Sequence, residues 1–522
     1  MKALTTTLTA ALAIAGFLAG PASPASATTD GGSVAWTDSG PVRGTVADDH
    51  RTFQGIPYAA PPVGELRWRS PRPPTPWTQP RDATQPGPAC PQVQNLRPPS
   101  ETEDCLYLNV TTPRPSGRLK PVMVWLHGGG NVFGAGGDFD AHRLAVGGDV
   151  VVVTFNYRLG VFGFLGHPEL SSSGAFGLED QQAALRWVQR NAASFGGNPG
   201  NVTLFGQSGG AYDTCAQLTS PSARGLFQHA IFESGTCSMS WTANGVNPGI
   251  SAGKPWQPLA DAEAAGTALA AKEGCGDPAT QVDCLRKLPV SKLLADTASA
   301  ELPKVAFGNR VLPESPDSAI AAGHFQRVPV MSGTTRDEQR LATAFLQQAF
   351  TEEGYQQLLV QAFGDKAPEV AARYRSADLG SPALAWAAVA TDRTWSCSQL
   401  IDDRLLAQRT PVFAFEFADR NAPPPFPFPP GFPPGAFHGA ETEYLFDLFG
   451  TAAPLTPDQQ RLADQLIRYW SRFAATGSPN GEDSPRWPRF RPSDVQSLAP
   501  GEGGIHQVDL SAEHNCDFWR SF

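Results

Sequence analysis

Short apolar runs alternate with amphipathic stretches between positions 120 and 235, and this alternation predicts strands that alternate with helices. Continuous apolar runs are typical of strands that are buried on both faces of a sheet. We expect such strands at residues 121–126, 150–155, 201–205 and 229–235. Residues 178–195 carry Leu185, Val188 and Ala192 at helical spacing and lead into a Gly-Gly-Asn-Pro turn. The pattern therefore predicts an α/β fold with a mostly parallel central sheet flanked by helices.

The pattern changes beyond residue 240, where helical and irregular stretches dominate. Short strands return at 328–332 and 412–417, and residues 457–476 have the spacing of an amphipathic helix. We interpret the large side chains on one side of that helix as core: Leu462, Leu466, Tyr469, Trp470 and Phe473. The chain of 522 residues exceeds the ~250–300 residues that one core usually serves. It therefore contains either two domains or one sheet with large helical and loop insertions.

The first 27 residues have the composition of a secretory signal peptide. Lys2 gives a basic start, residues 10–19 are apolar, and residues 25–27 (Ala-Ser-Ala) are the small residues of a cleavage site. The apolar run is shorter than the ~20 residues that span a bilayer, so a retained N-terminal anchor is the weaker alternative. We expect cleavage after Ala27 and a secreted product with no stable membrane insertion.

Charge and cysteine content narrow the possible partners and the compartment. The formal net charge is −10 at pH 7 and no basic run is present, which argues against binding to nucleic acid or to anionic membranes. Eight cysteines in an exported chain are expected to pair, although spacing alone does not determine the connectivity. For Cys215 and Cys237, both a disulfide and two buried thiols remain open.

The sequence Gly-Gln-Ser-Gly-Gly at residues 206–210 is the main candidate for chemistry. It follows the predicted strand 201–205 and precedes a stretch compatible with a helix through about residue 218. A Gly-x-Ser-x-Gly turn between a strand and a helix exposes its serine as a nucleophile, and the glycines allow so tight a turn. The alternative is a glycine-rich loop with an incidental serine. If the segment is such a turn, Ser208 is the nucleophile.

A serine hydroxyl needs a base, an acid that orients the base, and donors for the oxyanion. In sheets with this turn the order along the chain is serine, acid, histidine. The histidines after Ser208 are His324, His438, His506 and His514. Of these, His438 follows strand 412–417 and a loop rich in proline and glycine, as a base would, whereas we interpret His506 and His514 as structural. For the acid, Asp337 and Glu338 both follow strand 328–332, and spacing does not choose between them.

The oxyanion donors are expected at the glycine run 128–130, which directly follows strand 121–126, and at Gly209. Glycines let backbone N–H groups approach a reacting carbonyl closely. A flexible turn is the alternative for the glycine run.

Six ordered segments resemble the type-B carboxylesterase/cholinesterase family of α/β-hydrolases. They are residues 53–59, 103–110, 124–130, 156–160 and 195–199, together with the serine turn. The resemblance extends from about residue 30 to the C-terminus. It implies a single α/β-hydrolase domain over residues 28–522 and hydrolysis of small-molecule carboxylic esters through an acyl-enzyme, with no metal or organic cofactor.

The resemblance also assigns roles to individual residues. It implies Ser208 as nucleophile, His438 as base and Glu338 as acid, since this family uses a glutamate there. It implies oxyanion donors and disulfides as well: Gly129, Gly130 and Gly209, and the pairs Cys90–Cys105, Cys275–Cys284 and Cys397–Cys516. Arg158 and Asp180 look like a structural ion pair.

The chain departs from the family at the serine turn and in the loop that follows Cys90. Gln207 stands where the family usually has glutamate, which removes a negative charge near the site, and Gly209 stands where alanine is usual. In choline-selective members a tryptophan of this loop binds the quaternary ammonium, whereas residues 91–104 here contain no aromatic side chain. We therefore expect choline esters to be poor substrates.

A loop of prolines and phenylalanines at residues 423–435 precedes His438. Its aromatic side chains either line a hydrophobic substrate pocket or pack on the body of the protein. A lipase or polyester hydrolase that acts at interfaces, and a non-catalytic binding protein on the same fold, are the alternatives to a serine carboxylesterase. The natural ester and the oligomeric state are left open.

Overall fold

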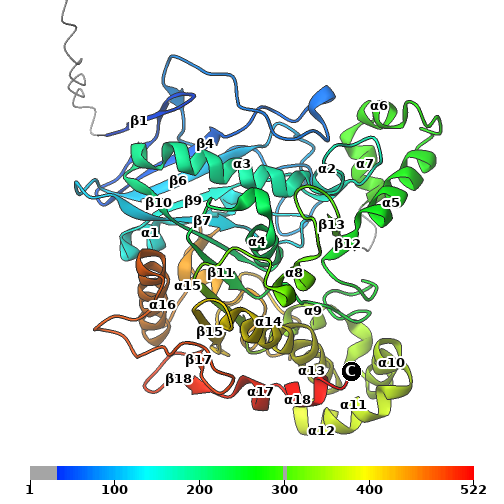
Figure 1. Ribbon diagram of the computed structural model, residues 1–522. Coiled ribbons are helices and arrows are strands. Elements are labelled where there is room, and N and C mark those ends of the chain that lie inside the picture. The colour runs from blue at the N-terminus through cyan, green and yellow to red at the C-terminus, as the bar shows by residue number, and fades with distance from the viewer. Residues whose placement is uncertain (1–31, 298–301) are drawn as a thin grey trace, which may run out of the picture.

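The computed structural model describes residues 32–297 and 302–522, so the predicted signal peptide lies outside the described residues. An eleven-stranded sheet runs through the molecule (Figure 1). In spatial order its strands are β18 (Ile505–Val508), β17 (Val495–Leu498), β15 (Val412–Phe417), β14 (Val330–Thr335), β11 (His229–Glu233), β10 (Gly197–Gln207), β7 (Lys120–Leu126), β9 (Val151–Phe155), β6 (Tyr107–Pro113), β4 (His50–Pro57) and β3 (Thr45–Val46).

The strands from β17 to β9 are all parallel, and antiparallel strands occupy both edges of the sheet. β18 pairs antiparallel with β17, and β6, β4 and β3 continue antiparallel beyond β9. The prediction of a mostly parallel central sheet is confirmed. The carboxyl ends of the parallel strands share one edge, which is where α/β sheets bind ligands.

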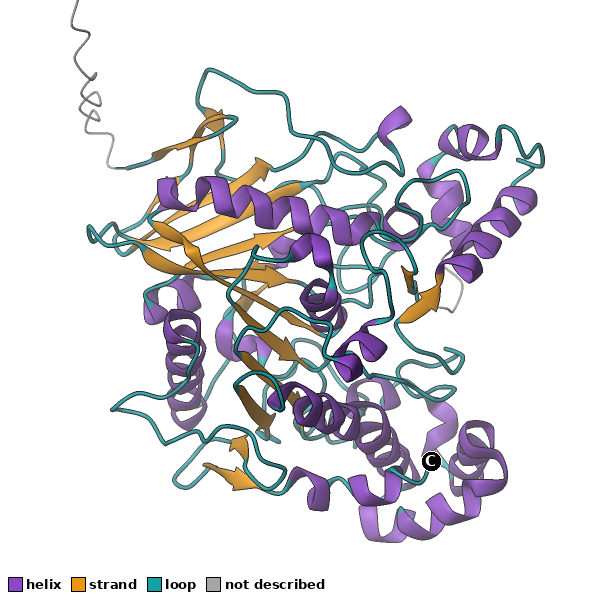
Figure 2. Cartoon of the chain, viewed as in Figure 1, coloured by secondary structure: helices purple, strands orange, loops and turns teal. Residues whose placement is uncertain are grey.

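Helices cover both faces of the sheet (Figure 2) because the central strands are apolar on both sides. In β7, Val122 and Val124 face one hydrophobic cluster, while Met123 and Trp125 face the other. The first cluster is completed by α3 (Phe176–Asn191), α4 (Gly209–Thr219) and α14 (Cys397–Ala407). The second is completed by α1 (His142–Gly148) and α16 (Pro457–Thr476). The large apolar residues of α16 are buried, as predicted.

Smaller elements form the insertions, and Figure 1 shows α5–α7 and α10–α12 beyond the sheet. The helices are α2 (Gly160–Phe164), α5 (Leu259–Lys272), α6 (Gln281–Arg286), α7 (Val290–Thr297), α8 (Pro316–Ala322), α9 (Arg340–Thr343), α10 (Glu352–Phe363), α11 (Ala367–Arg373), α12 (Ser376–Leu379), α13 (Pro382–Ala390), α15 (Thr442–Leu445), α17 (Leu510–Glu513) and α18 (Cys516–Trp519). The short strands are β1 (Val34–Thr37), β2 (Gly40–Arg43), β5 (Arg81–Asp82), β8 (Phe139–Asp140), β12 (Trp256–Pro258), β13 (Val305–Phe307) and β16 (Asp447–Leu448).

All eight cysteines pair in the structure. The three expected disulfides are present, and Cys215 of α4 pairs with Cys237, which follows β11. The open question about this last pair is therefore answered in favour of a bridge. Within the described part of the chain, no helix is long and apolar enough to cross a membrane.

Candidate active site

Ser208 occupies a sharp turn between the end of β10 and the start of α4. Its backbone has φ 55° and ψ −120°, a conformation that side chains rarely adopt, and its N–H donates to the carbonyl oxygen of Glu233 at 2.8 Å. The flanking glycines are required by sterics: a Cβ on Gly210 would lie 1.9 Å from the carbonyl oxygen of Leu126, and one on Gly206 would lie 2.5 Å from that of Gly210. The sharp turn between a strand and a helix that was predicted at residues 206–210 is therefore present.

Glu338 and His438 form a hydrogen-bonded pair at the carboxyl end of β14. Nδ1 of His438 lies 2.5 Å from Oε2 of Glu338, while Oε1 accepts a 2.8 Å hydrogen bond from the N–H of Thr335. Both oxygens of this buried carboxylate are thus held in place. Asp337 binds the guanidinium of Arg420 instead. The structure brings Glu338, and not the neighbouring Asp337, to the imidazole.

The second imidazole nitrogen faces the serine turn but contacts Gln207. Nε2 of His438 lies 3.2 Å from Nε2 of Gln207, the residue directly before Ser208. Because Nδ1 points at Glu338, Nε2 is free to accept a proton and here accepts the amide N–H. No hydrogen bond joins Ser208 to His438 among the described residues. Catalytic hydrogen bonds are often incomplete until substrate binds.

Trp395 packs on His438, a contact that the sequence pattern did not predict. The two ring centroids lie 4.5 Å apart, and the indole N–H donates to the side chain of Gln339 at 3.1 Å. Trp395 lies in a π-helical turn, Thr391–Ser396, between α13 and α14. Such turns are frequent at functional sites. The indole restricts the positions that the imidazole ring can take.

The glycine run approaches the serine turn closely enough to form an oxyanion hole. Gly129 has φ 103° and Gly130 has φ 59°, so both need glycine. A Cβ on Gly209 would lie 2.8 Å from the backbone nitrogen of Gly130. Within residues 32–297 and 302–522, the N–H groups of Gly129 and Gly130 donate to no backbone acceptor. They are available to a substrate oxygen.

Two buried carboxyl groups near Glu338 were not found from the sequence. Glu441 is fully buried with both oxygens unpaired in the described structure, and Glu233 accepts a 2.7 Å hydrogen bond from the indole N–H of Trp470. Burial raises the pKa of Glu233 to about 8. Burial also raises the pKa of Glu441, and the carboxylates of Glu233 and Glu338 raise it further. Glu233 therefore holds a proton at neutral pH, and burial disfavours the charged form of Glu441 in the same way.

The proline-rich loop packs on the body of the protein. Phe426, Phe428 and Phe432 stack in series, and Phe432 is buried. Phe428 also contacts Phe437, next to His438, and Phe432 contacts Phe350. Of the two interpretations of this loop, packing on the body of the protein applies to Phe428 and Phe432.

His514 and His506 have partners or positions apart from the Glu338–His438 pair. His514 lies between the carboxylates of Asp392 and Glu416, each at 2.6 Å. Burial alone would lower the pKa of His514, but the two carboxylates outweigh it and raise the pKa to about 10. His506 lies in the edge strand β18. The structural interpretation of both residues fits these positions, as it does for Arg158, which forms a buried 2.7 Å ion pair with Asp180.

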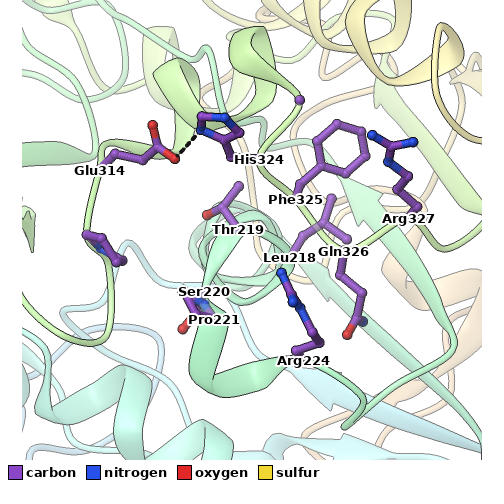
Figure 3. Close-up of a pocket in the computed structure, with 12 residues that line it drawn as sticks. Leu218, Thr219, Ser220, Pro221, Arg224, Glu314, His324, Phe325, Gln326 and Arg327 are labelled. Atoms are coloured by element: carbon purple, nitrogen blue, oxygen red, sulfur yellow. Dashed lines mark hydrogen bonds and ion pairs between the residues drawn. The ribbon is translucent and has the colours of Figure 1, made fainter.

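Two cavities differ in their position relative to the candidate site. One, of about 420 Å³, lies at the end of α4 and is lined by His324, Glu314 and Arg224 (Figure 3). Ser208, Glu338 and His438 do not line it. The other, of about 560 Å³, is mainly apolar and is lined in part by Val132 and Leu302. A Cβ on Gly130 would lie 3.0 Å from Cδ2 of Leu302, so this apolar cavity adjoins the glycine run.

Comparison with known proteins gives a consistent result. Residues 32–519 match the model of the carboxylesterase family. The para-nitrobenzyl esterase of Bacillus subtilis (strain 168) is 34% identical over 490 residues, which cover 88% of this chain and 93% of that protein. The fumonisin B1 esterase of Sphingopyxis macrogoltabida is 33% identical over 535 residues, covering 96% and 92%.

The fold is shared as well. A solved structure of a thermophilic pNB esterase has a TM-score of 0.76 at 31% identity and covers 93% of this chain and 99% of its own. The similarity in sequence and in fold thus extends over nearly the whole chain, and the relatives are ester hydrolases. The chain belongs to the carboxylesterase family and is a carboxylic-ester hydrolase.

Proposed function

We propose that this protein is a secreted serine carboxylesterase that hydrolyses neutral, hydrophobic esters through an acyl-enzyme. The observation that carries the proposal is the 2.5 Å contact between Glu338 and His438 beside the strained turn of Ser208. A buried carboxylate that fixes one imidazole nitrogen leaves the other to act as a general base.

In the first half-reaction, Oγ of Ser208 attacks the ester carbonyl carbon as Nε2 of His438 takes its proton. Glu338 holds the Nδ1 proton and stabilises the imidazolium cation. The N–H groups of Gly129, Gly130 and Gly209 bind the oxyanion, a stabilisation worth about 3–4 kcal/mol per donor in comparable sites. The tetrahedral intermediate collapses, the leaving alkoxide receives the proton from His438, and the acyl-enzyme remains.

In the second half-reaction, water attacks the acyl-enzyme with His438 again as base, and Ser208 leaves with the returned proton. For either step the imidazole must exchange its contact with Gln207 for one with Ser208 or with water. The exchange moves the imidazole from the Gln207 amide to the neighbouring residue of the turn. This exchange distinguishes the proposed resting state from the reacting state.

The apolar cavity beside the glycine run supports a hydrophobic substrate group. Its volume of about 560 Å³ is within the range of small-molecule sites, and Leu302 lies between it and Gly130. Secretion is supported by the four disulfides, which persist in oxidising compartments, and by the signal-peptide composition of residues 1–27. N-terminal sequencing of the exported protein tests the cleavage after Ala27.

The adjacent acids provide a matched test of the triad. We expect Glu338→Gln to lower kcat for p-nitrophenyl butyrate by about 10²–10⁴-fold, because the amide no longer stabilises the imidazolium. Asp337→Asn, at the next position, should retain activity within about tenfold. Equal losses in the two variants would contradict the assignment of Glu338. Loss of stoichiometric organophosphate labelling in Ser208→Ala checks the nucleophile, and failure of the wild type to label would contradict a serine nucleophile.

The lipase alternative rests on the exposed part of the proline-rich loop. It predicts a sharp rise in rate when long-chain esters pass their solubility limit. The carboxylesterase proposal instead predicts saturation on soluble short-chain esters and no such rise. Rates measured across the solubility limit with one acyl series separate the two.

A further inference from the structure

Three side chains with the donor atoms of a metal site meet on the surface, at the far end of the sheet from Ser208. They are Asp49, His50 and His142. Within the described residues this is the one group of three in which histidine, cysteine or carboxylate donors all lie within 4.8 Å of one another. His50 pairs with Pro113, the last residue of β6, and thus lies at the amino-terminal edge of the parallel strands.

We propose that Asp49, His50 and His142 bind a divalent transition-metal ion, with Zn²⁺ as the best match, and that the ion links the β3–β4 turn to α1. The donors are one carboxylate and two imidazole nitrogens. Imidazole suits zinc, copper and nickel, whereas magnesium and calcium prefer oxygen ligands alone.

The three side chains already face one another. Oδ1 of Asp49 lies 2.6 Å from Nδ1 of His50, and Oδ2 lies 3.0 Å from Nε2 of His142. The two imidazole rings lie 4.3 Å apart between centroids. The carboxylate of Asp49 thus contacts one nitrogen of each ring, and these two nitrogens are the atoms that would bind the ion.

The distances require only a small adjustment. With zinc–ligand bonds of about 2.0–2.2 Å, tetrahedral donors lie about 3.3 Å apart. The atoms of Asp49 and the two histidines are between 2.6 Å and 4.8 Å apart, so shifts of about 1–2 Å at side-chain ends form the site. The side chain of His142 is 40% exposed and that of Asp49 is 49% exposed, which leaves room for water as a fourth ligand.

The backbone fixes all three residues. The N–H of Ala47 donates to the carbonyl oxygen of His50 at 3.0 Å, closing the β3–β4 turn, and Asp49 accepts from the N–H of Arg114 at 3.1 Å through its carbonyl oxygen. His142 is the first residue of α1, and its N–H donates to the carboxylate of Asp140 at 2.9 Å. The ligands therefore come from two rigid segments that are separated by more than ninety residues.

The local charge also suits a cation. Asp49 contributes a carboxylate to the three donors. Asp140 adds a second carboxylate next to His142. Arg114 opposes this charge in part, through a guanidinium that reaches the carbonyl oxygen of Asp48.

The chain provides its own matched control. His324 and Glu314 form a surface pair at 2.8 Å, visible in Figure 3, with a similar histidine–carboxylate contact but no second histidine. A site that needs three ligands should bind zinc at Asp49, His50 and His142 and not at His324. Any weak attraction of zinc to one surface histidine would affect both places.

The test is calorimetric titration of chelator-treated full-length protein with ZnCl₂. We expect one tight site with a dissociation constant in the micromolar range or below. His142→Gln and Asp49→Asn should each weaken it by at least tenfold, and His324→Gln should leave it unchanged. Thermal denaturation gives a second readout: zinc should raise the Tm of the wild type and of His324→Gln, and not that of His142→Gln.

Two results would overturn the proposal. One is binding no tighter than millimolar in the wild type, which would leave the cluster as a hydrogen-bonded clasp. The other is equal zinc affinity in the wild type and His142→Gln. Ester hydrolysis should be the same with and without zinc, because the cluster lies at the opposite end of the parallel strands from Ser208. Circular dichroism confirms that each variant is folded.

Discussion

Replacing Glu233 by glutamine should stabilise the protein, and by more as the pH rises. Glu233 is fully buried in β11 and its pKa is raised by burial from 4.5 to about 8. On unfolding it regains an ordinary pKa and ionises. Between pH 4.5 and 8 the folded state therefore holds a proton that the unfolded state releases, so stability falls as the pH rises through this window.

The size of the stability change follows from the pKa shift of Glu233. At about 1.36 kcal/mol per pH unit, the buried acid costs about 3 kcal/mol at pH 7 and less than about 1 kcal/mol at pH 5. Glutamine removes this cost and keeps an oxygen that accepts the 2.7 Å hydrogen bond from Trp470. For a domain of this size, about 3 kcal/mol corresponds to roughly 3 °C in Tm.

The assay is the Tm of the wild type and of Glu233→Gln at half-unit steps from pH 5 to pH 8. We expect the variant to be higher by roughly 3 °C at pH 7, with the difference nearly absent at pH 5. Glu482→Gln, at an exposed position, is the control and should show no pH-dependent difference. A constant difference at every pH, or a variant that is less stable at pH 7, would refute the reasoning.

Three further predictions concern the site and its support. Gln207→Glu places a carboxylate within reach of Nε2 of His438, and a carboxylate there favours the protonated imidazole. The acidic limb of the pH profile of kcat/KM for a neutral ester should therefore move up by about 1–3 pH units. An unchanged profile would contradict the contact. The double variant Cys215→Ser with Cys237→Ser releases α4 from the segment after β11 and should lose about 3 kcal/mol of stability, seen as a lower non-reducing Tm; an unchanged Tm counts against the bridge. Acetylcholine should be hydrolysed no faster than its neutral analogue 3,3-dimethylbutyl acetate, since residues 91–104 hold no aromatic side chain. A roughly tenfold preference for the cation would instead indicate that Trp395 binds it.

The regular elements near the sheet were predictable because their patterns are local. The strand 412–417 and the helix 457–476 have the predicted bounds, since apolar runs and 3.6-residue spacing are written in consecutive residues. β10 is longer than the predicted 201–205 and starts at Gly197, which pairs with Lys120 of β7. That extension depends on a neighbouring strand and has no local signal.

The carboxyl groups show the limit of sequence reasoning most clearly. Asp337 and Glu338 have the same local sequence environment, and the direction of each side chain in the fold separates their partners. Glu233 and Glu441 are ordinary glutamates in sequence. The pKa of each group is raised mainly by burial, and burial is a property of the assembled fold.

The sequence by itself determined the family, the α/β architecture and the position of the serine turn, because these depend on residue types at short spacing. The resemblance implied Glu338 as the acid, and the tertiary structure shows it at His438. Only the tertiary structure decided that Gln207 contacts the second nitrogen of His438, that Cys215 bonds to Cys237, and that Asp49 and His142 meet on the surface. Each of these pairs joins residues that are distant along the chain. Such contacts are set by how strands and helices pack, and packing leaves no signature in a single sequence.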